Sequence, residues 1–168
     1  MTSIEPMPRT AGHVTAEAII AAPADAVWRL LSNLERWPQW KKDIQTIHVA
    51  GPHEAGTRFV STGRRKTTSE LREVVSSKRL VWSGRAFGFR VLHTYELKAL
   101  NNFTHVRTTE TFEGPLPSMF PRLMQKKVSK ELEQCLADLK IELRNLKWEG
   151  GKTAGSKSDA TVAAQSLN

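Results

Sequence analysis

The chain has 168 residues, of which 39% are hydrophobic and 25% are charged, as expected for one globular domain with a substantial core. No stretch approaches the roughly 18 apolar residues of a membrane span, and the opening MTSIEPMPRT has a glutamate and two prolines where a signal peptide needs an apolar block. The single cysteine, Cys135, excludes an internal disulfide and a cysteine zinc cluster, and its leucine-rich helical surroundings favour a buried, inert thiol. We therefore expect a cytoplasmic protein without a membrane span.

The formal net charge of +8 raises the question of a nucleic-acid or anionic-membrane partner. The positive charges are spread over short clusters, such as residues 64–66 at an expected turn and residues 126–133, where lysines alternate with glutamates. There is no long arginine-rich arm and no sequence signature of a nucleic-acid-binding module. We expect a solvated basic surface and no nucleic-acid partner; binding to DNA or RNA would require steeply salt-dependent affinity.

Polar and apolar residues alternate weakly over residues 13–20, which predicts a first strand. Pro23 suits the first turn of a following helix. Apolar residues between 27 and 34 give that short helix one apolar side, and Pro38 is expected to stop it. Further strands are predicted at 44–49, 57–61, 67–75, 79–83, 89–99 and 103–112. Asn101 and Asn102 join the last two strands, because asparagine tolerates the positive φ angles of tight hairpins.

One long helix follows, with Ser118 as its expected N-cap and Pro121 in its first turn. Apolar residues recur at steps of three and four from Met124 to Leu146 and form one stripe. A run of antiparallel strands followed by a helix predicts an α+β domain, with one sheet packed on that helix. We divide the chain into a flexible leader at 1–12, the domain at 13–148, and a flexible tail at 149–168 that lacks aromatic residues.

Two stretches resemble a known family. IIAAPADAVWRLLSNLERWPQW resembles the opening of START-like helix-grip (SRPBCC) proteins of the polyketide cyclase/dehydrase type, and HTYEL…THVRTTETFEG resembles their later strands. The resemblance covers about residues 14–146 and implies a curved antiparallel sheet around a long C-terminal helix, two short helices after the first strand, and a cavity between sheet and helix. Members bind or transform apolar molecules such as polyketides, sterols, lipids and plant hormones, and some are cyclases or dehydratases. The fold alone does not choose among these activities.

Three of the five tryptophans lie between residues 24 and 40. The resemblance places Trp28, Trp37 and Trp40 where the short helices close one end of the cavity. We expect Trp28 and Trp37 to pack in the core, and Trp40 to face a ligand. Gly84 and Gly88 flank the tip of the hairpin between the strands predicted at 79–83 and 89–99. This tip is either a plain loop or a cover for the cavity mouth.

The hairpin around Asn101 and Asn102 predicts which residues share a face. If Leu100 pairs with Phe103, the pairing continues to Tyr95 with Thr108 and to His93 with Glu110. The face that carries His93 and Glu110 is otherwise mainly apolar and is expected to point inward. An inward histidine and carboxylate cost desolvation free energy unless they satisfy each other, so we predict that these two side chains are hydrogen-bonded.

Three roles are open for the pair: a polar anchor for a ligand, a structural pair, or a general acid/base that makes His93 and Glu110 candidate catalytic residues. The sequence has no nucleophile–base pair, metal-ligand spacing or phosphate-binding glycine loop, so we expect no metal and no cofactor. The predicted ligand-binding residues are Trp40, Phe59, Trp82, His93, Tyr95, Glu110, Phe112, Met124 and Val128.

The main hypothesis is a protein that binds a small hydrophobic molecule (polyketide-, lipid- or sterol-like) in an internal cavity, with or without cyclase or dehydratase activity. The alternative is a basic interaction module whose core is filled by side chains and which binds no ligand. Uptake of an apolar probe distinguishes the two, because a filled core has no room for it. Homo-oligomerisation stays open.

Overall fold

The structure is a computed structural model that describes the backbone of residues 12–163 and the side chains of residues 12–146. The expected leader, apart from Gly12, lies outside the described residues. None of the helices in the described range is both long and apolar enough to cross a membrane.

Seven strands and four short helical segments precede the long C-terminal helix. In chain order the elements are β1 (Gly12–Ile20), α1 (Ala24–Ser32), the 3-10 helix η1 (Leu34–Arg36), α2 (Trp37–Trp40), β2 (Ile44–Val49), β3 (Arg58–Gly63), β4 (Thr67–Val75), β5 (Arg79–Ala86), β6 (Phe89–Leu100), β7 (Phe103–Glu113), α3 (Pro115–Met119) and α4 (Pro121–Ala163). This order confirms the predicted α+β helix-grip architecture with short helices after the first strand.

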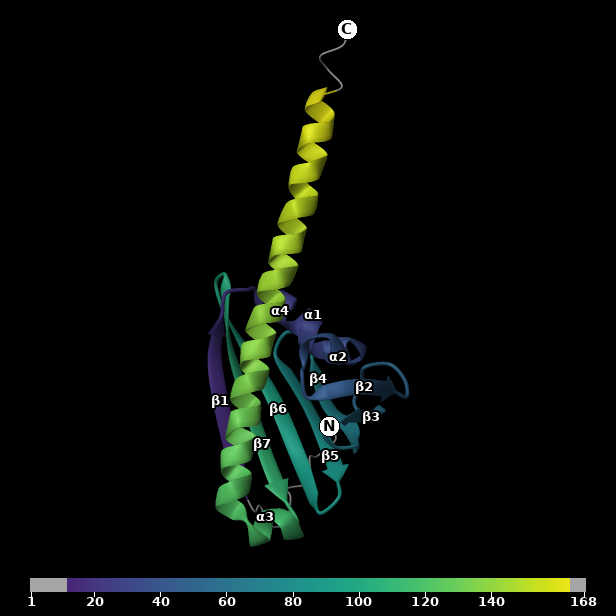
Figure 1. The fold of residues 1–168 in the computed structure, drawn as a ribbon, viewed down its shortest axis with the longest axis vertical. Helices are drawn as coiled ribbons and strands as arrows, with labels where there is room; N and C mark the ends of the chain where they lie inside the picture. The colour runs from purple at the N-terminus through teal and green to yellow at the C-terminus, as the bar shows by residue number, and fades with distance from the viewer. Residues whose placement is uncertain (1–11, 164–168) are drawn as a thin grey trace.

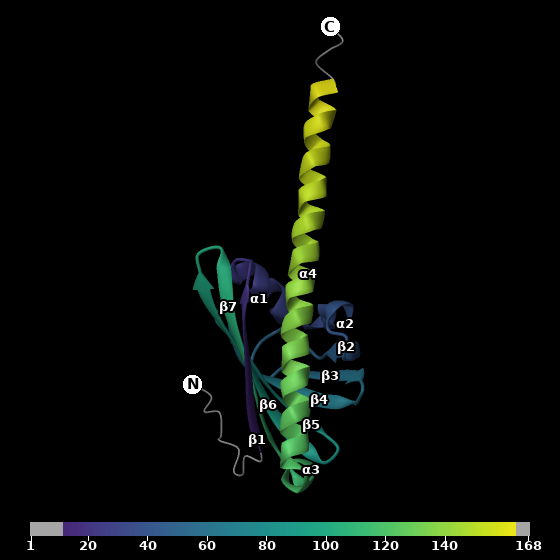
Figure 2. The same cartoon turned by 60° about the vertical axis from the view of Figure 1, so that its left-hand side comes forward.

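The strands form one antiparallel sheet in the order β1-β7-β6-β5-β4-β3-β2, and α4 crosses its inner face (Figures 1 and 2). The pairing register shifts between Leu71 and Glu73 in β4 and between Ile44 and Thr46 in β2. Such irregularities bend and twist a strand, which helps the sheet curve around a helix. The short helices α1 and α2 cover the inner face beside α4 (Figure 1).

The predicted hairpin register is confirmed. Leu100 pairs with Phe103, Tyr95 with Thr108, and His93 with Glu110. Asn101 adopts φ +54°, the positive angle for which asparagine is suited. The shared face is the inward one, because its apolar residues Tyr95, Leu97, Val106 and Phe112 are all buried.

Apolar side chains from α1, α2 and α4 fill most of the space above the sheet. The stripe on α4 is buried as predicted at Leu132, Leu136, Leu139 and Leu143. A smaller cluster of Phe112, Val128 and Leu132 packs at the N-terminal part of α4.

Three local predictions are wrong. Pro38 lies in the first turn of α2, where its missing N–H costs no hydrogen bond, so the chain forms another helical turn instead of leaving the helix there. Ser118 lies inside α3, so it does not cap α4. The backbone of α4 continues to Ala163, beyond the expected end at residue 146. The predicted flexibility of residues 149–168 stays a prediction.

Candidate functional site

A cavity of about 190 Å³ lies between the sheet, α2 and the N-terminal half of α4. We call it the inner cavity. Strands β3 to β7 supply about half of its lining residues. The others come from α4 (Lys127, Glu131, Leu132 and Cys135), from α2 and the start of β2 (Trp37, Lys41, Asp43 and Ile44), and from the β3–β4 turn (Arg64 and Arg65). The hydroxyl residues Ser61, Thr62, Thr67 and Ser69 line one side of it. The inner cavity therefore offers both apolar surface and hydrogen-bonding groups.

Aromatic rings form the apolar part of the wall. Trp82 of β5 stacks on His93 of β6, with ring centroids 4.2 Å apart and planes 8° from parallel. Trp37 lies 5.0 Å from Trp82 between centroids and meets the edge of Phe59 at 6.0 Å. Stacked and edge-to-face contacts hold these rings in place and give the wall a flat apolar surface.

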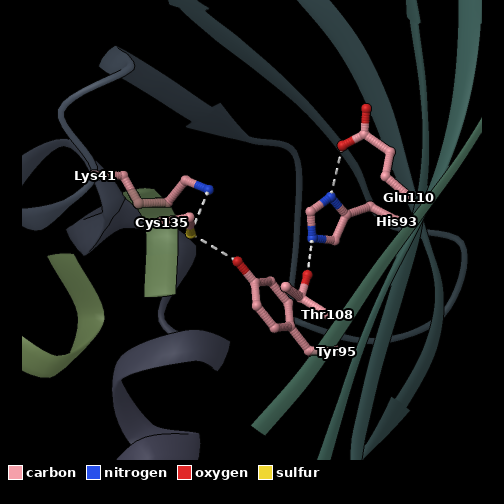
Figure 3. Close-up of polar contacts among 6 residues, drawn as sticks. All are labelled: Lys41, His93, Tyr95, Thr108, Glu110 and Cys135. Carbon is pink, nitrogen blue, oxygen red and sulfur yellow. Dashed lines mark hydrogen bonds and ion pairs between the residues drawn. The ribbon is translucent and has the colours of Figure 1, made fainter. Parts of the chain in front are cut away.

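His93 is held by two hydrogen bonds from its ring (Figure 3). Its Nδ1 lies 3.0 Å from Oε2 of Glu110, and its Nε2 lies 2.8 Å from Oγ1 of Thr108. The tautomer that satisfies both contacts carries the proton on Nδ1, which donates to the carboxylate, while the Thr108 hydroxyl donates to Nε2. The second carboxylate oxygen of Glu110 points away from His93 (Figure 3).

Burial lowers the pKa of His93 below its ordinary value of 6.5, and the nearby Glu110 opposes that change only in part. His93 is therefore neutral at pH 7, in agreement with its hydrogen bonds. A neutral imidazole with both nitrogens occupied positions Glu110 and has no vacant nitrogen to accept a ligand proton.

This environment predicts acid sensitivity. Below pH 6.5 the unfolded chain binds a proton at this histidine and the folded protein resists it, so the free energy of unfolding falls as the pH decreases. We expect the wild type to lose more stability than the double variant His93→Phe/Glu110→Leu between pH about 7.5 and 5.5 in urea unfolding. Equal losses in the two proteins would contradict a buried neutral His93.

A second polar cluster lies across the cavity from His93 (Figure 3). Nζ of Lys41 lies 3.3 Å from Sγ of Cys135, and the Tyr95 hydroxyl lies 2.8 Å from the same sulfur. All three side chains are buried. Burial disfavours the charge on Lys41, yet its contacts with Cys135 and Tyr95 outweigh this effect and raise its pKa. Burial, followed by Cys135, raises the pKa of Tyr95, so its hydroxyl keeps its proton.

Charged residues surround the opening of the inner cavity. Arg64, from the β3–β4 turn, lies 3.7 Å from Glu131 of α4, and Lys127 lies 3.9 Å from the same carboxylate. Arg65 lies over the ring of Phe89, 5.1 Å from its centroid. Burial raises the pKa of Glu131, and Lys127 opposes the change. The Arg64–Glu131 pair connects the sheet to α4 at this opening.

The structure brings together four of the nine predicted ligand-binding residues, since Phe59, Trp82, His93 and Glu110 all line the inner cavity. Tyr95 lies behind this wall, where it contacts Cys135. The remaining four, Trp40, Phe112, Met124 and Val128, do not line it. Phe112, Met124 and Val128 pack against one another in the smaller apolar cluster.

Trp37 packs in the core as expected and also lines the inner cavity, whereas Trp40 does not line this cavity. Trp37 lines the inner cavity and donates its indole N–H to the carbonyl oxygen of Leu31 at 3.0 Å. Trp40 is buried on the other side of α2, facing Asp138 and Ile141 of α4. Both are buried at opposite ends of one helical turn, and sequence spacing alone does not show which end faces the sheet.

Sequence reasoning missed several wall residues. Lys41 follows directly after Trp40 and carries no signal that separates it from Lys42. The predicted burial of Cys135 agrees with the structure, but its polar contacts come from residues distant in sequence. Phe89 lines the cavity, whereas Phe87 at the hairpin tip is 95% exposed and does not cover the mouth.

A second hollow of about 600 Å³ lies at the opposite end of the domain, between α1, the β6–β7 turn and α4. Its wall consists mainly of small apolar side chains, with Arg29 and Arg36 at its edge. It contains none of the predicted site residues. Its polar lining residues are Arg29, Arg36 and Asn102, and none of them is hydrogen-bonded to another lining residue as His93 is to Glu110 in the inner cavity.

Residues 12–146 contain no group of three or more histidine, cysteine or acidic side chains placed to hold a metal ion.

Residues 11–144 match the model of a family described as polyketide cyclase/dehydrase and lipid transport. The chain belongs to this family. A search of curated protein sequences found no match.

Several solved structures share this fold. A START superfamily protein from Mycobacterium smegmatis superposes with a TM-score of 0.68 at 17% identity, over 80% of this chain and 98% of that chain. The protein TTHA0849 from Thermus thermophilus superposes with a TM-score of 0.69 at 23% identity, over 80% of this chain and 99% of that chain. The ZhuI aromatase/cyclase from Streptomyces sp. R1128 superposes with a TM-score of 0.69 at 15% identity, over 79% of this chain and 93% of that chain. At these identities the similarity establishes the fold, not a ligand.

Proposed function

We propose that the protein binds a small, flat hydrophobic molecule that carries a hydroxyl group, in the inner cavity between the sheet and α4. The observation that carries this proposal is the His93–Glu110 pair, a hydrogen-bonded polar group fixed beside aromatic rings. Ligand sites commonly combine apolar walls with a few fixed polar groups that set orientation. The family, described as polyketide cyclase/dehydrase and lipid transport, supports the same class of ligand.

The size of the inner cavity favours a ligand of one or two fused rings. Its volume of about 190 Å³ is below the roughly 300–1,000 Å³ of typical ligand pockets. A compact polyketide-like phenol suits this volume better than a sterol, which would require α4 to move away from the sheet. The presence of this space also favours a ligand-binding protein over an interaction module with a filled core.

Glu110 is the proposed anchor. Its Oε2 accepts a hydrogen bond from His93 Nδ1, and its second oxygen accepts a hydrogen bond from the ligand hydroxyl. A second candidate function follows from the same geometry, because a carboxylate beside a bound ligand can act as a general base in a cyclisation or dehydration. In that case His93 positions Glu110 and does not itself accept the substrate proton.

Calorimetry with β-naphthol tests binding. We expect saturable binding at one site per chain, and binding of naphthalene that is about tenfold weaker or more, because naphthalene lacks the hydroxyl that Glu110 accepts. Equal affinity for the two molecules would contradict the anchoring role of Glu110. Absence of binding for both would contradict the proposed function and support the filled-core alternative.

Two adjacent threonines on β4 give a matched test of location. Thr67 lines the inner cavity, whereas Thr68 is exposed on the opposite face of the strand. We expect Thr67→Phe to weaken β-naphthol binding about tenfold or more, because the new ring occupies the ligand space. Thr68→Phe should change the affinity less than about twofold, since it adds the same ring on the outer face. The reverse result would place the ligand elsewhere.

A further inference from the structure

Three side chains from separate elements meet at one sulfur atom in the wall of the inner cavity. Lys41 follows α2, Tyr95 lies on β6, and Cys135 lies on α4. The ammonium of Lys41 and the hydroxyl of Tyr95 both contact Sγ of Cys135, at 3.3 Å and 2.8 Å. Figure 3 shows the ammonium and the hydroxyl on different sides of the sulfur. The ammonium can only donate, so the sulfur accepts its hydrogen bond and is placed beside a positive charge.

The charged groups around Lys41 also indicate that the Cys135 sulfur is the partner of its ammonium. Lys41 is only 6% exposed, and among residues 12–146 no carboxylate oxygen lies within 4.0 Å of its Nζ. Its ring contacts with Trp37 and Trp40, at 5.1 Å and 5.9 Å, supply only partial compensation. A buried ammonium requires an anionic partner or a strong acceptor, and the Cys135 sulfur is the group in hydrogen-bonding contact with it.

We propose that Cys135 is a nucleophile that binds α,β-unsaturated carbonyl compounds covalently in the inner cavity, with the Lys41 ammonium placed to stabilise negative charge on its attacking sulfur. The thiolate is the nucleophilic form of cysteine, and a neighbouring ammonium stabilises it. This inference rests on the proposed ligand-binding function of the same cavity, and it adds the chemical class of one set of ligands.

The reaction is a conjugate addition that needs no oxidant or reductant. The sulfur of Cys135 forms a bond to the β-carbon of the ligand, and the π electrons of the carbon–carbon double bond move toward the carbonyl oxygen. The α-carbon then takes a proton, which the Lys41 ammonium supplies and recovers from water. The product is a thioether that contains every atom of the ligand.

The surroundings select this class of electrophile over simple aldehydes. Lys41 retains its proton, because its contacts with Cys135 and Tyr95 raise its pKa, so its amine is not available to form an imine. The stacked rings of Trp82 and His93, with Trp37 beside them, form a flat wall that suits a conjugated system. Sulfur is therefore the reactive atom, and the wall holds the conjugated plane beside it.

Other ionisable groups face this cluster from each neighbouring element. Asp43, after α2, acts on both Lys41 and Tyr95, and the His93 ring lies 4.9 Å from Tyr95 between centroids. On α4 itself, Glu131 lines the cavity one turn before Cys135, and Asp138 is buried against Lys42. The pH dependence of the rate of adduct formation is therefore compared only between variants that retain all four of these ionisable groups.

The test uses benzylideneacetone, an aromatic enone, with the intact protein. Because Cys135 is the only cysteine, intact-mass spectrometry reports its reaction directly. We expect one adduct per chain that adds the full mass of the enone, at a rate that saturates with enone concentration. Cys135→Ser should form no adduct but should still bind the enone reversibly in calorimetry. At neutral pH the wild-type rate should exceed that of free cysteine about tenfold or more.

A lysine on the exposed side of α4 gives a matched control. We expect Lys41→Met to slow adduct formation about tenfold or more at neutral pH, because the sulfur loses the ammonium that stabilises its nucleophilic form. Lys130→Met, which removes a charge from the exposed side of α4 and outside the inner cavity, should change the rate less than about twofold. If Lys41→Met does not fold, Tyr95→Phe removes the hydroxyl that contacts the sulfur and is expected to change the rate as well.

The outcomes separate the two proposals. Reversible binding by Cys135→Ser without any adduct on the wild type would overturn the covalent role and leave the proposed function standing. Failure of both proteins to bind the enone would overturn both proposals. An adduct that forms at equal rates in wild type and Lys41→Met would overturn the role of Lys41 in stabilising the thiolate.

Discussion

Replacing Leu139 with aspartate is expected to leave the protein unfolded or molten at room temperature. Leu139 lies in the middle of the described part of α4, has no exposed surface, and packs in the main apolar cluster between helix and sheet. The substitution removes apolar contacts and places a carboxylate inside an apolar cluster. The combined cost is about 4 kcal/mol or more, which is comparable to the roughly 5–15 kcal/mol of total stability in a typical domain.

Two controls make this result specific. Lys140→Asp changes the next residue on the exposed side of the same helix and should alter stability by less than about 1 kcal/mol. Leu139→Met keeps the volume and should cost less than about 1.5 kcal/mol. Circular dichroism and urea unfolding measure all three. A cooperatively folding, soluble Leu139→Asp would mean that this face of α4 does not fill the sheet.

The sequence predicted the sheet well because its signals are local. The β6–β7 hairpin is an example: two asparagines set the turn, and the turn sets every pair along the strands, including His93 with Glu110. The stripe on α4 was predicted for a similar reason, since the helical period depends only on neighbouring turns. Boundaries were less accurate at Ser118 and Pro38, where proline is compatible with a helical turn as well as with a break.

The inner cavity could be predicted only in part, because it depends on contacts between distant elements. The resemblance to a family implied a cavity but not which apolar residues line it and which pack beside it. Phe112 and Val128 point inward as predicted, yet they meet each other instead of a space. The Lys41–Cys135–Tyr95 cluster joins residues 94 and 40 positions apart, which no spacing rule connects.

Exchanging His93 for phenylalanine is expected to keep the fold and lower its stability. A phenyl ring can occupy the place of the imidazole on Trp82, so the stacking survives. The Glu110 carboxylate then loses its donor, and the hydroxyl of Thr108, which is fully buried, loses its acceptor. Each unsatisfied group costs about 1–3 kcal/mol, so the total loss is expected at the upper end of that range or above it.

The double variant His93→Phe/Glu110→Leu tests whether the two side chains act as a pair. The double variant should lose about 1 kcal/mol or more less unfolding free energy than the two single variants lose together. The loss that remains in the double variant comes from the Thr108 hydroxyl, which still lacks its partner. Urea unfolding of the four proteins measures this coupling. Additive losses would mean that the side chains do not interact in solution.

Ligand binding by the same double variant separates an anchor from a structural pair. If Glu110 accepts the ligand hydroxyl, the stable double variant should bind β-naphthol about tenfold more weakly than the wild type. Its affinity for naphthalene should stay within about twofold, because the rings of Trp37 and Phe59 are unchanged. Unchanged affinity for both molecules would make the pair structural, because the carboxylate would then contribute to the sheet and not to recognition.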